Sequence, residues 1–563
     1  MECRTTGDFQ DIDGVFTTRF NGFQNSSEIE INDYDGNGDD IVRIFGGELT
    51  DDVSTTPSVG GLPAEGSTSL QPADGTIELL GGKDQFEMFY GDYLGEPFAP
   101  NVRANLDTGA GDDTVVIQAG SIQDINLGDG TDSAVISGNG TQVGTVNGGA
   151  GNDTITLAGN ATIGGSIFGD DGNDTVNING GTIGTTTAPG RVDLAAGADI
   201  FNMTAGHITG SVFGEGGGNT YTVSGGTIDG SIYAGSQNDS VSISGNASVG
   251  VDAAVGGPDS VGLEDGDDTF TMTGGTLAGS VSGGAGNDII ALRGGAINSF
   301  LEGNDGNDQI SVSGGALAGE VIGDAGDDLI VISGGTIGST VSGDDGNDTV
   351  RILGGTIGTT VAPADVDLGA GANTFEMSGG TVNGSVFADD GGNRYTVSGG
   401  TITGSLFAGS GNDSVTISGT AIIQGNGLGV FAVVVPSGTV ALEDGNDTFN
   451  MTGGTVGGSV TGDDGNDTMT VSGGAIADAL EGNAGDDQLT VSGGSVGGGI
   501  FGGDSNDTVT VSAGTVGGNV SGGAGFDNVS VTGGIIKGGI DADHVDLSGG
   551  TIDGDITGLG PNT

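Results

Sequence analysis

The chain has 563 residues, and its 76 acidic and 10 basic side chains give a formal net charge of −66. Charge of this sign excludes nucleic acid as a natural partner, because binding a phosphate backbone requires lysine and arginine. Cys3 is the single cysteine, so no intrachain disulfide can form, and no apolar run reaches the roughly 18 residues of a membrane span.

The chain divides into five segments by its repeat pattern. Residues 1–34 lie outside the repeat and are expected to form an N-terminal cap, which solenoids need to cover their first coil. Residues 35–150 are expected to form irregular coils. Residues 151–347 and 348–546 are two copies of a regular block, and residues 547–563 form an end without a comparable cap.

An aspartate-rich turn recurs through both blocks, as in Gly303-Asn304-Asp305-Gly306-Asn307-Asp308. We call the last Asp or Asn of each turn its marker residue. From marker 174 to marker 348 the steps are 25, 20, 20, 29, 20, 20, 20 and 20 residues, and from 348 to 527 they are 25, 20, 20, 34, 20, 20, 20 and 20. Because the eight-step pattern occurs twice, we infer that an eight-coil block was duplicated whole.

Each coil alternates apolar and polar residues with period two, as half-buried strands do. In one typical coil this predicts strands over 329–333 and 336–341, with Ser339 among the inward residues and Gly334 and Gly335 reversing the chain between the strands. Strands stacked about 4.8 Å apart predict an all-β fold. It is a flattened, β-roll-like parallel β-solenoid with about 20 residues and two strands per coil.

Large apolar residues follow each lengthened step of the repeat. Phe375 and Met377 come after the 25-residue step that ends at marker 373, and Phe201 and Met203 follow the equivalent step in the first block. We expect a longer coil to enclose a wider core, which these side chains fill.

The turn sequence carries the chemistry. Residues 148–156, 283–291 and 522–530 match the nonapeptide Gly-Gly-x-Gly-x-Asp-x-U-x, where U is a large apolar residue. Here the chain resembles the calcium-binding β-rolls of the repeats-in-toxin family. That family has an acidic nonapeptide on both edges of each coil, whereas the opposite turn here reads Ser-Gly-Gly-Thr. We therefore expect one row of Ca²⁺ ions along one edge.

The residue types support this expectation independently of the resemblance. Glycines let backbone carbonyls turn inward, and two stacked Asp turns together offer the six to eight oxygens that Ca²⁺ prefers. Marker carboxylates about 4.8 Å apart would otherwise repel by about 0.9 kcal/mol per pair even at the dielectric constant of water. The predicted ligands are Asp40, Asp113, Asp153, Asp174, Asp239, Asp268, Asp288, Asp308, Asp328, Asp348, Asp413, Asp447, Asp467, Asp487, Asp507 and Asp527.

Some turns are expected to bind calcium poorly or not at all, because Asn219, Asn373 and Asn393 replace the marker aspartate. The alternative that Asp and Asn serve only as good turn formers stays open. Circular dichroism with EDTA separates the two interpretations.

Several functions remain open at this point. The coil also resembles the passenger regions of autotransporters and the ice-binding solenoids of bacterial adhesins. Ice binding would need threonine at the third position of the turn, where the chain has Ala285, Asp305 and Ala325. A secreted polysaccharide lyase or epimerase is a further alternative. We expect no enzyme and name no catalytic residue, since the chain lacks Gly-x-Ser-x-Gly and zinc-ligand spacing.

The favoured prediction is a calcium-hardened structural or adhesive rod. Because cytosolic Ca²⁺ is too scarce to fill weak sites, we expect it outside the cell or on the cell surface, of a Gram-negative bacterium if the autotransporter resemblance holds. The expected partners are calcium ions, further copies of the chain joined head to tail into filaments or a surface layer, or a cell-surface or glycan receptor.

Overall fold

The computed structural model describes residues 28–32, 41–45, 48–49, 76–79, 82–89, 91–93, 96–98, 101–102, 105–251, 259–425 and 438–558. The chain divides into two compact units, unit 1 (Met1–Ser282) and unit 2 (Gly283–Thr563). No described residue lies in a helix, and so none of the described segments is a helix that could cross a membrane. The predicted cap over 1–34 lies outside the described residues except for its last strand, β1 (Glu28–Asn32).

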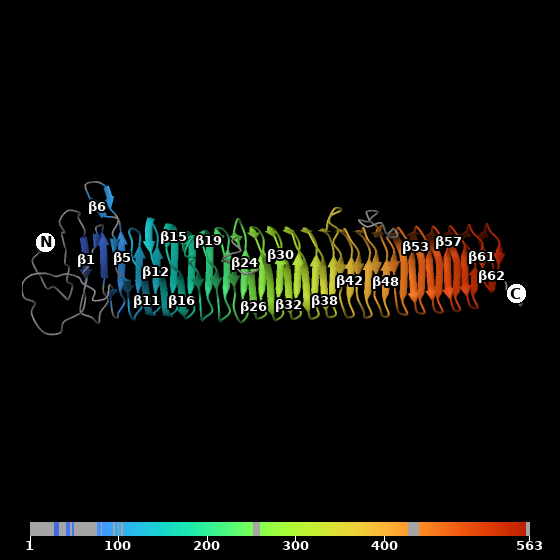
Figure 1. The fold of residues 1–563 in the computed structure, drawn as a ribbon, viewed down its shortest axis with the longest axis horizontal. Coiled ribbons are helices and arrows are strands. Elements are labelled where there is room, and N and C mark those ends of the chain that lie inside the picture. Colours follow the sequence, from blue (N-terminus) through green and yellow to red (C-terminus); the bar gives the residue numbers. More distant parts are fainter. Residues whose placement is uncertain are drawn as a thin grey trace, which may run out of the picture. The chain divides into compact units, whose positions relative to one another are not determined.

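Unit 1 is a parallel β-solenoid that begins with an antiparallel pair. Strand β1 pairs antiparallel with β2 (Ile41–Phe45), and β2 pairs parallel with β5 (Gln85–Phe89). From there each coil adds either one long strand or two short strands to one sheet and one strand to a second sheet. On one sheet β15 (Thr154–Ile163) pairs with β17 (Thr175–Ile183), and on the other β14 (Val146–Gly151) pairs with β16 (Ile167–Asp171) (Figure 1).

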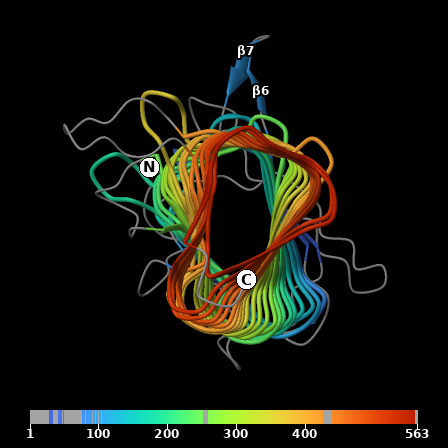
Figure 2. The ribbon, with the colours of Figure 1, turned by 90° about the vertical axis from the view of Figure 1, so that its right-hand side faces the viewer.

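Unit 2 repeats the same coil in register. Strands β36 (Leu329–Ile332) and β37 (Thr336–Ile337) lie in one sheet, and β38 (Val341–Asp345) lies in the other. Each pairs in parallel with its equivalent 20 residues away, so that Leu329 lies beside Thr349 and Val341 beside Val321. Both units therefore confirm the predicted all-β parallel β-solenoid. Figure 2 shows the successive coils of each unit end-on.

The prediction that Gly334 and Gly335 reverse the chain is wrong. The strands on either side of them, β36 and β37, belong to one sheet, and the reversal falls at residues 338–340, before β38 begins. Gly335 has a φ of 77°, which bends the sheet without ending it. In β53 (Thr468–Ile476) the strand runs through the equivalent glycines. Ser339 consequently sits at the corner, half-buried.

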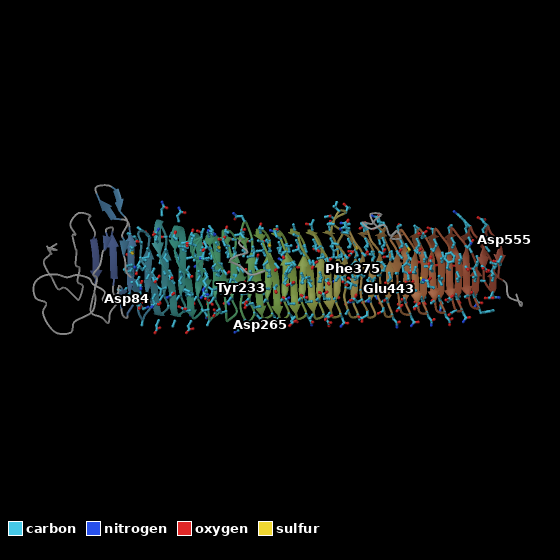
Figure 3. The ribbon with its side chains drawn as sticks, in the orientation of Figure 1. Asp84, Tyr233, Asp265, Phe375, Glu443 and Asp555 are labelled. Carbon is cyan, nitrogen blue, oxygen red and sulfur yellow. The ribbon has the colours of Figure 1, made fainter. Side chains whose placement is uncertain are left out.

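The core consists of the inward residues of each strand. Ile330, Ile332 and Val341 have no solvent exposure, and burying such a side chain stabilises the fold by about 1.5–3 kcal/mol relative to leaving it exposed. Phe375, labelled in Figure 3, and Met377 are also buried, as predicted. The expectation that a longer coil encloses a wider core is wrong, however. The five extra residues of that step, 359–363, form an exposed loop and do not lengthen the strands.

Candidate functional site

The acidic turn places its marker residue inside the coil. Near the end of β35 (Val321–Ala325), Asp324 adopts a left-handed φ of 72°, and Gly326, just after the strand, has a φ of 140°. A side chain on Gly326 would collide with the Gly306 carbonyl of the preceding coil, so only glycine fits there. The chain then turns inward, and the marker Asp328 is only 2% exposed.

The markers form a hydrogen-bonded row, which we call the inner column. The Asp308 N–H donates to Asp328 Oδ1 at 2.7 Å, and the Asp328 N–H donates to Asp348 Oδ1 at 2.8 Å. The Asp153 N–H in unit 1 donates in the same way to Asp174 Oδ1 at 2.8 Å. Each marker side chain therefore accepts a bond from the coil before it.

The residues just before the markers form a second row, the outer column, which is exposed and runs the opposite way. The Asp327 N–H donates to Asn307 Oδ1 at 2.7 Å, and the Asn347 N–H donates to Asp327 Oδ1 at 2.8 Å. Each Asn-Asp or Asp-Asp pair thus binds the coil before it and the coil after it. This explains why an Asn-Asp or Asp-Asp pair recurs at most of the turns, and it supports the interpretation of these residues as turn formers.

In fourteen carboxyl groups of the inner column, one oxygen is buried without a hydrogen-bond partner. A buried polar atom without a partner costs about 1–3 kcal/mol, and more when it is charged. Burial accordingly raises the pKa of Asp328 to about 7, of Asp348 to about 6 and of Asp239 to about 8. The unpartnered atoms are the Oδ2 atoms of Asp113, Asp132, Asp153, Asp174, Asp199, Asp239, Asp308, Asp328, Asp348, Asp413, Asp447, Asp467, Asp487 and Asp507.

A backbone carbonyl flanks this oxygen. A Cβ placed on Gly343, five residues before its marker, would lie 2.6 Å from Asp348 Oδ2 and 2.7 Å from the Leu368 carbonyl oxygen of the next coil. The same point at Gly148 lies 2.8 Å from Asp153 Oδ2 and 2.6 Å from the Gly169 carbonyl oxygen. The marker carboxyl oxygen and the carbonyl oxygen of the next coil therefore both lie against the α-carbon of this glycine. The carboxyl oxygen is buried without a hydrogen-bond partner, and a buried carboxylate in this state calls for a proton or a cation.

Two of the asparagine markers donate a hydrogen bond to the carbonyl of the next coil, which an ionised carboxyl oxygen cannot do. Asn393 Nδ2 donates to the Ala408 carbonyl at 3.0 Å, and Asn219 Nδ2 donates to the Ala234 carbonyl at 3.2 Å. Ala408 and Ala234 precede the next marker by five residues, as Leu368 and Gly169 do. At these coils the amide N–H donates to the carbonyl that corresponds to the one beside Oδ2 in the aspartate coils.

Unit 2 also carries an acidic groove of about 500 Å³ along the turn edge. Burial, followed by the charge of Asp344, raises the pKa of Asp324, and burial together with the charge of Asp389 raises that of Asp367. In unit 1 the labelled Asp265 lies at the corresponding edge (Figure 3). The groove is lined by Asn304, Asp305, Asp324, Ala325, Asp344, Asp345, Asp367, Gly369, Ala370 and Asp389.

The predicted ligands within the described residues all occur at marker positions and are buried. Asp40 lies outside the described residues. The inner column also contains Asp84, Asp132 and Asp199, which the sequence reasoning left off the ligand list although the hydrogen bonds tie them into the same row. Across the described ranges no three His, Cys, Asp or Glu side chains form a metal-binding group, so a cation there would need backbone carbonyls as ligands.

Comparison with known proteins gives little further. No family model and no curated protein matches the chain. Among solved structures, the chain is similar to a hyperactive, Ca²⁺-dependent, β-helical antifreeze protein from an Antarctic bacterium, at 17% sequence identity and a TM-score of 0.24. The match covers 71% of this chain and 88% of that one. Calcium dependence and antifreeze activity are stated for that protein, and at this similarity they carry no argument for the present chain.

Proposed function

We propose that the chain is a structural β-solenoid whose acidic turns bind calcium ions in a row along one edge of each unit. The supporting observation is the second carboxyl oxygen of the inner column, which is buried without a partner beside a backbone carbonyl oxygen. A cation between successive turns would bridge the two kinds of oxygen and compensate the buried charge. Ca²⁺ suits such a set, since it accepts six to eight oxygens from carboxylates, carbonyls and water.

The donor set also indicates how tightly calcium would bind. Each site would draw most of its ligands from carbonyls, because no three carboxylates converge in the part of the chain that the structure describes. Affinity for Ca²⁺ decreases when fewer of the ligands are charged, and extracellular modules bind Ca²⁺ with Kd values of about 10⁻⁴–10⁻³ M. We therefore place the protein outside the cell, where calcium is abundant enough to fill such sites.

A proton is the competing occupant. A protonated marker carboxyl could donate to the same carbonyl with no ion present, and the raised pKa values make this state accessible near neutral pH. At pH 8 the carboxyl groups with pKa values of about 6 to 7 have lost their protons. A measurement at this pH therefore distinguishes bound calcium from a bound proton.

The test uses the full chain, dialysed against EDTA at pH 8 and then titrated with CaCl₂. Bound calcium is counted by atomic emission after equilibrium dialysis, and unfolding is followed by circular dichroism. We expect several ions per chain and a rise in melting temperature. MgCl₂ is the control, because Mg²⁺ requires a tighter octahedron and gives up water reluctantly. An unchanged melting curve together with no bound calcium would contradict the proposal.

A structural or adhesive role at the cell surface is the second part of the proposal. It is supported by the in-register stacking of similar coils and by the likeness of the turns to calcium-binding β-rolls. Self-association into filaments or a surface layer would follow, with a glycan as an alternative partner. Negative-stain microscopy in calcium should show fibres or sheets, and isolated particles at high protein concentration would contradict self-association.

A further inference from the structure

We propose that the pairs Asn219–Tyr221 in unit 1 and Asn393–Tyr395 in unit 2 are built-in substitutes for calcium. Each pair joins its coil to the next through hydrogen bonds, at the position where the aspartate coils bind an ion. This inference rests on the proposed calcium function and deepens it, because it names coils that take no ion and the groups that exclude it.

Both members of each pair donate to one carbonyl oxygen. The Ala408 carbonyl accepts from Asn393 Nδ2 at 3.0 Å and from the Tyr395 hydroxyl at 3.1 Å. In unit 1 the Ala234 carbonyl accepts from the corresponding side chains of Asn219 and Tyr221, at 3.2 and 3.0 Å. A carbonyl oxygen has two lone pairs. Protein donors use both of them here, which leaves no lone pair for a cation.

The tyrosine is as necessary to this arrangement as the asparagine. Tyr395 is fully buried, and burial raises the pKa of its hydroxyl, so the group stays a proton donor at every physiological pH. The residue at the same position in a typical aspartate coil is Ile330, which has no donor. Phe375, which packs against Tyr395 with ring centroids 6.3 Å apart, has none either.

Asn373 shows that an asparagine marker alone does not replace calcium between two coils. Its amide donates to the Gly369 carbonyl of its own turn at 3.2 Å, and the residue two positions on is Phe375. Within the described residues, its side-chain amide nitrogen makes no hydrogen bond to the following coil. The substitution for calcium between coils therefore belongs to the Asn-x-Tyr pair.

The consequence is an ion row broken at a fixed place in each unit. Markers up to Asp199 and from Asp239 onward bind ions in unit 1, with the coil of Asn219 between them. In unit 2 the break falls between Asp348 and Asp413. The two tyrosine coils remain joined to their neighbours when calcium is scarce, while the aspartate coils loosen.

The first test counts bound calcium in full-chain variants at pH 8. N393D combined with Y395F frees the Ala408 carbonyl and restores a carboxylate, so we expect one additional ion per chain. D328N is the matched control in an aspartate coil and should lose at least one ion. If the double variant gains no ion while the D328N variant loses one, the proposal that the Asn-x-Tyr pair replaces calcium is wrong, and the calcium function remains supported. If the wild type binds no calcium, both proposals fall.

A second test needs no variant. Hydrogen exchange of the wild type in EDTA at pH 8 should show backbone amides in β45 (Arg394–Val397) and β48 (Ser414–Ile417) protected at least tenfold more than those in β33 (Gln309–Val312) and β36. Calcium should remove most of this difference. Equal protection of the four strands in EDTA would overturn the inference.

Discussion

Unit 2 contains two kinds of coil, which differ in the residues five positions before and two positions after the marker. The coil of Asp348 has Gly343 five residues before the marker and Val350 two residues after it. The coil of Asn373 has Leu368 and Phe375 at those positions. We call the first kind aliphatic coils and the second kind aromatic coils.

In the aliphatic coil the marker carboxyl occupies the room beside Gly343, where a Cβ would lie 2.6 Å from its oxygen. In the aromatic coil a buried leucine stands at that position, and the marker is an asparagine whose amide has its own acceptor. Leucine and phenylalanine occur together at these two positions, whereas the marker varies, because other coils with the same leucine and phenylalanine keep an aspartate marker, as at Asp268 and Asp447. Four predictions follow from this comparison, in order of decreasing effect.

The largest effect is expected from pH in the absence of calcium. Asp328 and Asp413 have folded-state pKa values of about 7, against about 3.9 in an unfolded chain. Between these values the unfolded state binds fewer protons, so the stability of the calcium-free protein falls as pH rises from about 4 to about 7 and then levels off. In EDTA the melting temperature should drop by on the order of 10 °C between pH 5 and pH 8. Saturating calcium should largely abolish the drop, and a melting temperature independent of pH in EDTA would contradict the raised pKa values.

Removing the aromatic ring should have the next largest effect. Phe375→Ala leaves a cavity in a fully buried site and should reduce the free energy of unfolding by about 3–5 kcal/mol, measured by urea denaturation. The matched change Val350→Ala in an aliphatic coil removes fewer atoms and should cost less. Equal losses would show that the two coils are packed alike.

The glycine before the marker gives a finer test. Gly343→Ala brings a methyl group against Asp348 Oδ2 and the Leu368 carbonyl, and should destabilise the fold by about 1–3 kcal/mol through overpacking. It should also weaken calcium binding at that coil. Ala388→Gly, at the same position of an aromatic coil, removes a methyl group and should leave the calcium count unchanged. A Gly343→Ala variant as stable as the wild type would mean that the carboxyl group does not occupy this space.

The smallest effect is expected at the tyrosine hydroxyl. Tyr395→Phe removes one buried hydrogen bond, to the Ala408 carbonyl, and should cost about 1 kcal/mol. If this coil holds no ion, as proposed, the loss should be the same in calcium and in EDTA. A loss seen only with calcium present would place an ion at Ala408.

Much of the site could be predicted from the sequence, and the limits of that prediction have physical causes. The 20-residue step places the markers in one column, since parallel strands in register stack equivalent residues directly on one another. The spacing already made Asp132 and Asp199 marker residues, although they were left off the ligand list, and the hydrogen bonds show that they belong to the same row as the predicted ligands. The groove residues Asp367 and Asp389 do not share a position in the repeat, so spacing could not have grouped them.

The sequence by itself determined the parallel β-solenoid, the acidic edge and the buried aromatic positions, because each depends on a local period or on the spacing of equivalent residues. The tertiary structure decided that the double glycine bends one sheet, that the extra residues of a lengthened step leave the coil, and which carbonyl each marker side chain meets. These depend on atoms of neighbouring coils. The Tyr395 hydroxyl and the Asn393 amide, for example, converge on the carbonyl of Ala408 in the next coil, and the sequence pattern does not show which carbonyl they meet.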